Sequence, residues 1–353
     1  MISSKLKKSG PLQDMVGQMI LGGFKGKIIS EKCEVYDWIR SYNIGGVLLY
    51  DLEMTQSPPE KRNVESPEQV KRLTEDLQNI ADTPLFIAVD QEGGIVNRLT
   101  PEYGFPEFPS WHEIGKLNDT EKTKAFSLLV SDTLRTCGIN LNLAPVLDIQ
   151  KNSDSIIGKE GRCISGDPEQ ILKHSRTFIE EHQKKQIACS GKHFPGQGSA
   201  LQDAHDELTD ISDSWHRSEL YPYEELIRSG HLKMIMTGHV LIRSLDKNYP
   251  ATLSKKIIND LLRKKMGFDG VIISDDPVMK AISDHYSWEE TLELMINAGI
   301  DIICLGNNLI PYRENLIPNS IETIISLVDN GRVSSERIEE SYRRIINMKS
   351  MIV

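Results

Sequence analysis

The chain has 353 residues, of which 39% are hydrophobic and 26% charged, and its formal net charge at pH 7 is −10. This balance is that of a globular protein with a large core, and the acidic charge argues against nucleic acid as a partner because it repels phosphate backbones. We expect neither a signal peptide nor a membrane span, since the apolar run 15–21 is short and broken by Gln18.

The five cysteines are odd in number and share no C-x-x-C spacing, which argues against a disulfide framework or a structural zinc site. Cys189 and Cys304 lie in apolar runs, where a free thiol behaves as a small hydrophobe. We therefore expect reduced thiols, a cytoplasmic location and no contact with a membrane.

Short apolar runs recur along the chain and predict strands that are buried on both faces, because their apolar residues are nearly continuous rather than alternating. In chain order they are 18–24, 45–50, 84–90, 140–149, 187–194, 233–240, 270–276 and 301–306.

Between these runs, apolar residues at three- and four-residue spacing predict amphipathic helices. In chain order they are 31–42, 67–81, 121–137, 168–185, 216–229, 254–266, 288–298, 313–329 and 334–351. Ser66 before Pro67 is typical of a helix start, with a capping hydroxyl ahead of a proline in the first turn.

Eight strands that alternate with helices predict a parallel sheet. The chain length favours a single α/β domain over residues 1–353, folded as a (β/α)8 TIM-type barrel. The early strands of this barrel could be irregular. A two-domain Rossmann-like protein is the alternative, but no G-x-G-x-x-G follows a predicted strand. In a barrel, catalytic residues lie at the C-terminal ends of the strands. The predicted strands end there in Asp90, Asp148, Lys192 with His193, His239, and Asp275 with Asp276.

The stretch VIISDDPVM (271–279) places two adjacent carboxylates at the end of an apolar strand. Asp275 would point into the barrel mouth as a nucleophile or a metal ligand. Asp276 is expected to cap the following helix, because Pro277 suits a first helical turn. Taken alone, the plainer interpretation of the pair, a cap and a solvated carboxylate, is favoured.

Two further loops carry charge beside glycine. VDQEGGIVNRL (89–99) holds Asp90, Glu92 and Arg98 around a Gly-Gly turn that allows close backbone approach, although a tight turn with incidental charge is an equal alternative. GKEGRCISGDP (158–168) places Arg162 in a glycine-rich loop, where its guanidinium could hold hydroxyls or a carboxylate.

The stretch KHFPGQGSALQDAH (192–205) joins a strand end to a glycine-rich loop. An aspartate two residues from a histidine can orient the imidazole and support its cationic form, so Asp203 and His205 suit proton transfer. The alternatives are a solvent-exposed His205 and a hydrogen-bonded barrel residue at His193. Metal binding by these two histidines fits no known ligand spacing.

Together these motifs resemble glycoside hydrolase family 3, and within it the single-domain β-N-acetylglucosaminidases of peptidoglycan recycling. The matching segments are DQEGG..NR (90–98), GR (161–162), KHFPGQG (192–198), DAH (203–205), MTGHV (236–240), PATLS (250–254) and GVIISDD (270–276). The resemblance implies a retaining exo-β-N-acetylglucosaminidase of the β-N-acetylhexosaminidase type, acting on small carbohydrates such as the muropeptide GlcNAc-1,6-anhydroMurNAc. A monomer without a metal or an organic cofactor is expected.

The resemblance also implies a role for each matching position. Asp275 is the expected nucleophile, His205 the acid/base on a mobile loop, and Asp203 its partner. The residues expected to hold the hydroxyls of the N-acetylglucosamine ring are Asp90, Arg98, Arg162, Lys192 and His193. The loop must then bring His205 within reach of Asp275, and we expect it to be open or disordered without sugar.

Some positions depart from the family pattern, which has Arg at Ile95, Ser at Ala204 and often His at Gln197 and Pro at Thr209. None of these changes replaces Asp275, Asp203 or His205. We therefore expect the departures to affect the preference for the leaving group more than the activity itself.

Three other functions stay open from the sequence. A phosphorylase is one, because a neutral histidine base does not repel phosphate. A β-glucosidase of the same family is the second, although those generally carry additional C-terminal domains. The third is a sugar-binding barrel without turnover, against which the intact set of Asp275, His205 and Asp203 speaks.

Overall fold

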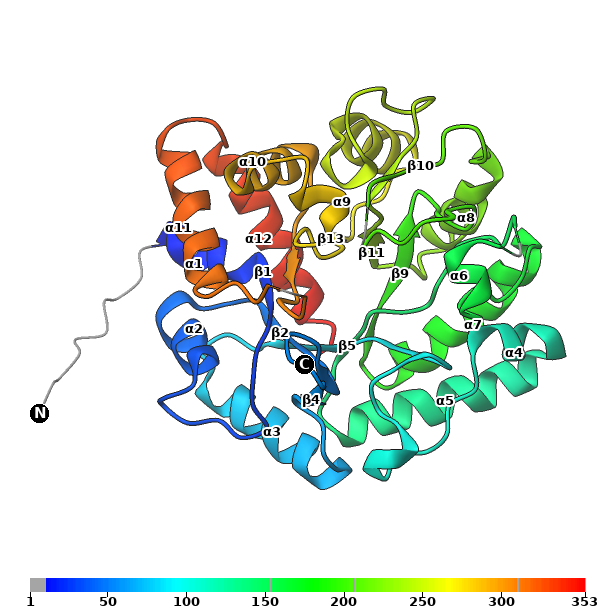
Figure 1. Ribbon diagram of the computed structural model, residues 1–353, viewed down its shortest axis with the longest axis horizontal. Coiled ribbons are helices and arrows are strands. Elements are labelled where there is room, and N and C mark those ends of the chain that lie inside the picture. The colour runs from blue at the N-terminus through cyan, green and yellow to red at the C-terminus, as the bar shows by residue number, and fades with distance from the viewer. Residues whose placement is uncertain (1–10, 153, 206, 310, 353) are drawn as a thin grey trace, which may run out of the picture.

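The computed structural model describes residues 11–152, 154–205, 207–309 and 311–352. Eight parallel strands form one sheet in the order β13–β11–β9–β8–β5–β2–β1–β14. A parallel bridge between Ile273 and Ile302 joins the two edges, so the sheet closes on itself. The helices surround the strands (Figure 1). The predicted (β/α)8 barrel is confirmed.

The barrel strands follow the predicted runs in chain order. They are β1 (Ile20–Gly23), β2 (Gly46–Leu49), β5 (Phe86–Val89), β8 (Leu141–Asn142), β9 (Ala188–Phe194), β11 (Met234–Thr237), β13 (Val271–Ser274) and β14 (Ile303–Leu305). Their residues are buried throughout, which is why these runs lack the polar–apolar alternation of a half-exposed sheet.

The fourth barrel strand is much shorter than the predicted run 140–149. Pro145 has no N–H to donate, so the ladder is interrupted beyond β8. An isolated parallel bridge between Val146 and Lys192 resumes the pairing with β9. The irregularity that we expected in the early strands therefore falls in the fourth, while β1, β2 and β5 pair without a register shift.

The predicted helices are present, with ends that differ by a few residues. The α-helices are α1 (Pro11–Gln18), α2 (Glu34–Tyr42), α3 (Pro67–Ile80), α4 (Trp111–Leu117), α5 (Thr120–Thr136), α6 (Ile156–Lys159), α7 (Pro168–Lys184), α8 (Tyr221–Arg228), α9 (Lys280–Ser283), α10 (Trp288–Ala298), α11 (Leu316–Asp329) and α12 (Ser335–Lys349). The 3-10 turns are η1 (Pro101–Tyr103), η2 (Arg217–Leu220) and η3 (Ala251–Leu253), and η4 (Lys256–Lys265) is π-helical. No helix among the described residues has the length and apolarity needed to cross a membrane.

Helix α3 begins as the sequence predicts. The Ser66 hydroxyl accepts a hydrogen bond from the Gln69 N–H at 3.2 Å, and Pro67 occupies the first turn. Helices α1, α4, α6 and α9 were not predicted; α6 and α9 are single turns, too short for a periodic pattern.

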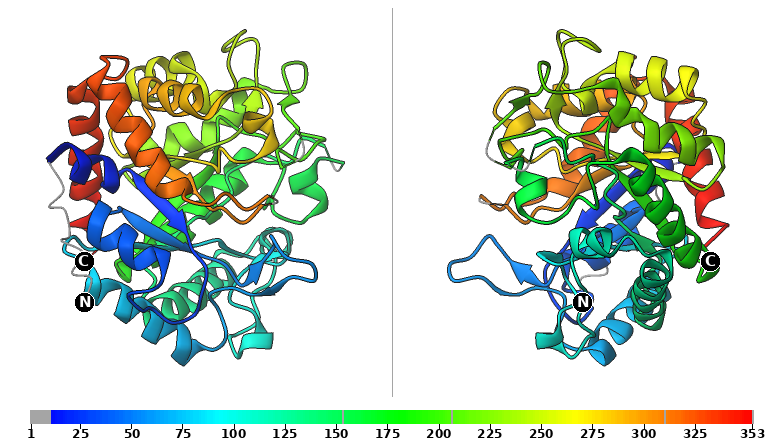
Figure 2. Two further views of the ribbon diagram at one scale, coloured as in Figure 1. Left: turned by 60° about the vertical axis from the view of Figure 1, so that its left-hand side comes forward. Right: turned by 90° about the vertical axis from the view of Figure 1, so that its right-hand side faces the viewer.

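Short strand pairs extend the loops beyond the barrel. They are the antiparallel hairpin of β3 (Leu52–Glu53) and β4 (Glu60–Lys61), the antiparallel pair of β6 (Gln91–Gly93) and β7 (Val96–Asn97), and the parallel pair of β10 (Thr209–Asp210) and β12 (Val240–Leu241). The β3–β4 hairpin projects from the body of the barrel (Figure 2). The first two pairs each lie in one loop after a barrel strand, whereas the third joins the loops after β9 and β11.

The buried carboxylate of Asp301 fixes the opposite, N-terminal face of the barrel just ahead of β14. It pairs with three arginines from two helices, Arg263, Arg337 and Arg344. It also accepts the Ile272 N–H at 3.0 Å, which ties β13 to the segment before β14. Residues at this face of a barrel serve stability rather than chemistry.

Candidate active site

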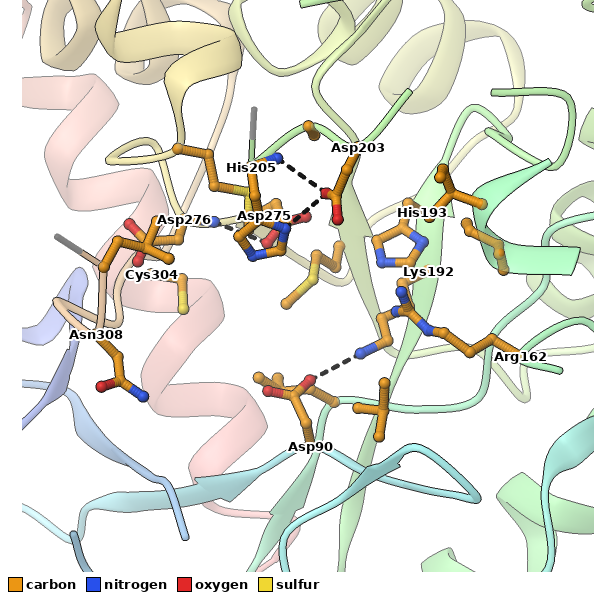
Figure 3. Close-up of a pocket in the computed structure, with 18 of the residues that line it drawn as sticks. Asp90, Arg162, Lys192, His193, Asp203, His205, Asp275, Asp276, Cys304 and Asn308 are labelled. Carbon is orange, nitrogen blue, oxygen red and sulfur yellow. Dashed lines mark hydrogen bonds and ion pairs between the residues drawn. The ribbon is translucent and has the colours of Figure 1, made fainter. Parts of the chain in front are cut away.

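A cavity of about 250 Å³ lies at the C-terminal ends of the strands. Its lining includes every residue to which the resemblance assigned a role: Asp90, Arg98, Arg162, Lys192, His193, Asp203, His205 and Asp275. All of them except Arg98 are labelled in Figure 3. They come from the end of β9 and from the segments after β5, β8, β9 and β13. Closure of the barrel brings these distant segments together.

Asp275 is the first of two carboxylates after β13. It lines the cavity, and its Oδ1 accepts the Asp276 N–H at 2.8 Å. Burial opposes its ionisation, but His239 and His193 outweigh burial and hold the pKa of Asp275 below its usual value. The group is therefore an anion at neutral pH, which a carboxylate nucleophile must be.

Asp276 is not the helix cap that we predicted. Its Oδ1 accepts the Val278 N–H and its Oδ2 the Gly306 N–H, both at 3.0 Å, whereas α9 begins only at Lys280. A turn separates the aspartate from the helix, so the carboxylate instead ties the end of β13 to the end of β14. Burial raises the pKa of Asp276 to about 6, and the charge of Asp275 adds to this rise.

Asp203 and His205 form a hydrogen-bonded pair. Nδ1 of His205 lies 2.7 Å from Oδ1 of Asp203, which also accepts the His205 N–H at 2.9 Å. The hydrogen bond from His205 lowers the pKa of Asp203 to about 2. The same bond raises the pKa of His205 although partial desolvation opposes the rise, and the charges of Asp203, Asp275 and Asp276 add to it. The pair thus favours the imidazolium.

The loop that carries this pair is docked against the segment after β13. The Ala204 carbonyl accepts the Ala281 N–H of α9 at 3.2 Å. In this arrangement His205 and Asp275 line the same cavity (Figure 3). The structure describes the docked loop; the open or disordered loop without sugar stays a prediction.

Lys192 is the centre of a charged network across the cavity. Its Nζ lies 2.7 Å from Oδ1 of Asp90 and 2.8 Å from Oε1 of Glu92. Arg162 holds Glu92 with two bonds of 2.9 Å. Burial disfavours the charged forms, but this pairing outweighs it, so the pKa of Lys192 is raised and that of Glu92 lowered. These groups stay charged and fixed in place, as recognition of hydroxyls requires.

His193 is fixed by Asp148. Its Nδ1 lies 2.7 Å from Oδ2 of Asp148, and its N–H lies 3.2 Å from each carboxylate oxygen. Oδ1 of Asp148 also accepts the Gln197 N–H at 2.9 Å. Because Nδ1 is engaged, Nε2 is the ring nitrogen of His193 that can serve a ligand.

Arg98 lies at the cavity with partners of its own. Its Nη1 is 3.6 Å from Oδ1 of Asp51, and its guanidinium lies 5.6 Å from the centre of the Tyr50 ring. The guanidinium of Arg62 lies 5.3 Å from the centre of the same ring. Arg98 thus lies at the site, where it contacts the segment after β2. The sequence did not indicate these contacts.

His239, at the end of the sixth predicted strand, is a buried structural residue. Its Nε2 lies 3.1 Å from the Asp276 carbonyl and its Nδ1 2.9 Å from Oγ1 of Thr252. Burial lowers the pKa of His239.

Two residues of the site were named from their positions at strand ends but were given no role. Glu92 connects Lys192 to Arg162, and Asp148 connects His193 to the loop after β9. Their position at or just beyond a strand end is the signal that marked them. Their partners lie on other strands, and a single sequence does not show that contact.

The positions that depart from the family pattern differ in their relation to the site. Ile95 is 65% exposed in the β6–β7 turn and does not line the cavity, whereas Ala204, Gln197 and Thr209 do. Within the described ranges, no group of three or more His, Cys, Asp or Glu side chains could hold a metal ion.

The chain resembles known proteins over most of its length. The model of the glycosyl hydrolase family 3 N terminal domain matches residues 11–348. A beta-hexosaminidase of Nitrosomonas eutropha is 30% identical over 317 residues, which is 87% of this chain and 86% of the relative. A beta-hexosaminidase of Tolumonas auensis is 34% identical over 275 residues, which is 76% of this chain and 78% of the relative.

Among solved structures, a glycoside hydrolase family 3 beta-N-acetylglucosaminidase from Paenibacillus sp. str. FPU-7 is similar, with a TM-score of 0.87 and 32% identity. The match covers 97% of this chain but 63% of the Paenibacillus chain. The shared fold, the family model and the identities agree with the motifs that the sequence presents. The chain therefore belongs to glycoside hydrolase family 3.

Proposed function

We propose that the chain is a retaining exo-enzyme that removes terminal N-acetylglucosamine from β-linked substrates through a glycosyl-enzyme on Asp275, with His205 as acid/base. The coarser activity, that of a β-N-acetylhexosaminidase, follows from the family and from relatives up to 34% identical. One observation carries the finer proposal: Asp275 and the Asp203–His205 pair line one cavity with the Lys192 network.

In the first step Asp275 attacks the anomeric carbon and His205 protonates the leaving oxygen. The lowered pKa of Asp275 keeps the nucleophile ionised. The raised pKa of His205 keeps a proton available near neutral pH. Breaking of the glycosidic bond and formation of the ester to Asp275 leave His205 neutral.

In the second step the neutral imidazole of His205 removes a proton from water, which attacks the anomeric carbon and releases Asp275. The sugar leaves with the configuration it had in the substrate, and His205 regains its proton. Asp203 stays ionised in both steps because its pKa is about 2.

The Lys192 network and His193 are suited to hold the sugar ring. Hydroxyl groups need fixed charged donors and acceptors, and Lys192, Asp90 and Arg162 supply both within one cavity. We propose a terminal N-acetylglucosamine as the occupant. The family resemblance supports GlcNAc-1,6-anhydroMurNAc as natural substrate and the cytoplasm as location.

Hydrolysis of 4-nitrophenyl β-N-acetylglucosaminide, with the first-formed anomer identified by NMR, tests the reaction. We expect the β-anomer from the native chain and almost no turnover by Asp275→Ala. Azide should rescue Asp275→Ala as the α-glycosyl azide and His205→Ala as the β-glycosyl azide, because azide replaces the nucleophile in one variant and water in the other. Full activity of Asp275→Ala, with Asp276→Ala inactive, would overturn the assignment of the nucleophile.

The same assay separates the alternatives. Release of N-acetylglucosamine 1-phosphate on addition of phosphate would identify a phosphorylase. Faster hydrolysis of the β-glucoside than of the N-acetylglucosaminide would identify a β-glucosidase. Binding of N-acetylglucosamine without turnover of any aryl glycoside would identify a sugar-binding barrel.

A further inference from the structure

The cavity is divided by polarity. Most of its charged residues, including Lys192, His193 and Asp275, are buried or partly buried, as expected for the floor of the site, whereas His205 is exposed. The apolar side chains that line it and remain partly or largely exposed include Leu52, Met54, Val96, Ile156 and Leu309. Met54 is the most open of them, with 48% of its surface exposed. Part of the mouth of the cavity is thus apolar, whereas the buried floor is ionic.

Met54 lies on the β3–β4 hairpin, whose base is fixed by Arg62. The Arg62 side chain is fully buried and lies 3.2 Å from Oε2 of Glu53. Its guanidinium donates to the Phe24 carbonyl at 2.8 Å and to Oδ1 of Asn308 at 2.7 Å. The hairpin base is thereby held to the segments after β1 and β14, so the position of Met54 is fixed before a ligand arrives.

Asn308 connects the hairpin to the segment after β14. Its Oδ1 accepts the Met54 N–H at 2.9 Å, and its Nδ2 donates to the Leu52 carbonyl at 3.0 Å. Leu309 follows directly and also lines the cavity. Figure 3 places Asn308 across the cavity from Arg162 and His193. Met54, through its bond to Asn308, and Leu309, which follows Asn308, therefore lie on the side of the cavity opposite Arg162 and His193.

We propose that Met54 and Leu309 form an apolar shelf that binds the leaving group. This inference rests on the proposed function, since an exo-enzyme places the terminal sugar on the ionic floor and the leaving group at the mouth. A polarizable, flexible methionine beside a leucine suits an aglycone with an apolar face, such as an aryl ring or the CH face of a second sugar. Asn308 is the positioning residue of the shelf, because it holds the Met54 backbone.

The shelf acts on the leaving group and not on the reacting bond. Truncation of Met54 removes most of one wall, and an apolar contact of this size is worth about tenfold in kcat/KM. A substrate whose leaving group makes no contact with the shelf should lose nothing. Fluoride is such a leaving group, because a single ion has no apolar face.

The test compares Met54→Ala with the native chain on two β-N-acetylglucosaminyl substrates, the 4-methylumbelliferyl glycoside and the glycosyl fluoride. The ratio kcat/KM is measured because it includes every step up to departure of the leaving group. We expect a loss of about tenfold on the aryl glycoside and less than twofold on the fluoride. Met54→Leu, which keeps an apolar side chain, should restore the aryl activity.

Met351→Ala is the matched control, since Met351 is a methionine of similar exposure (50%) that does not line the cavity. Equal losses on both substrates, or no loss on either, would overturn the shelf while leaving the proposed function intact, because the native chain still turns over the fluoride. A native chain that hydrolyses neither substrate would overturn the proposed function and the shelf together.

Discussion

The buried carboxyl group of Glu219 allows a quantitative test of how burial raises a pKa in this protein and changes its free energy of unfolding with pH. Glu219 lies on η2 and is 1% exposed. A Cβ at Gly196, in the loop after β9, would come within 2.6 Å of its Oε2. No side chain in the described ranges donates a hydrogen bond to either oxygen. Burial raises the pKa of Glu219 from 4.5 to about 8, and the charge of Asp148 adds to the rise.

The sign of the pH effect follows from this raised pKa. The unfolded chain ionises Glu219 near pH 4.5, whereas the folded protein keeps it protonated up to about 8. The unfolded state therefore binds fewer protons in this window, and stability falls as the pH rises. At about 1.4 kcal/mol per pH unit, the cost is about 3 kcal/mol at pH 7 and about 5 kcal/mol above pH 8, with none below pH 4.5.

Glu219→Gln keeps the shape of the side chain and is neutral in both states. We expect its free energy of unfolding, minus that of the native chain, to grow by about 3 kcal/mol from pH 4.5 to pH 7 in urea titrations. Any constant offset from the amide cancels in this comparison. Glu224→Gln, on α8, is the control, since a partly exposed carboxylate paired with the exposed Arg217 contributes at most about 1 kcal/mol. A difference that is flat with pH would refute the reasoning.

Three further predictions follow from other charged groups. Asp203→Asn should move the alkaline limb of the pH profile of kcat/KM to lower pH, because the carboxylate supports the proton on His205; an alkaline limb that does not move would show that His205 is not the catalytic acid. Burial lowers the pKa of Lys349 to about 7, so Lys349→Met should stabilise the fold most at or below pH 7 and progressively less up to pH 10.5, as urea unfolding would show. Asp301→Ala leaves the three arginines Arg263, Arg337 and Arg344 without their shared partner. It should lower the free energy of unfolding by about 3–5 kcal/mol, while kcat at low temperature stays native. A loss of kcat without a loss of stability would show that the N-terminal face of the barrel affects the active site.

The barrel could be predicted because its signal is local. Each strand is a continuous apolar run, and burial on both faces requires such a run. The fourth strand was overextended because its apolar residues continue past Pro145, where the ladder loses a donor. The β3–β4 hairpin was missed for the opposite reason. Its strands are two residues each, and the buried Arg62 that fixes it binds segments far along the chain.

The site could be predicted as a set of strand ends but not as a network. Position alone singles out Asp90, Lys192 and Asp275, because chemistry in a barrel lies where the strands end. The contacts of Glu92 with Lys192 and Arg162 join three different strand–loop units, and no spacing in the sequence indicates them. Asp276 shows the same limit, since a local cap was predicted and a bond to the Gly306 N–H of the next barrel unit was found.

The loop after β9 is held by stronger bonds at its base than at its tip. At the base, Asp148 accepts hydrogen bonds from His193 and from the Gln197 N–H, and bonds to a buried carboxylate are among the strongest in a protein. At the tip, the bond between Ala204 and Ala281 is a neutral one beside a half-exposed His205, so it is much easier to break. We therefore expect that the loop can withdraw His205, the proposed acid/base, without disturbing the residues proposed to hold the sugar. Such a division would let substrate enter while Asp275 and the ionic floor keep their geometry, and protonation of the leaving group would then depend on closure of the loop.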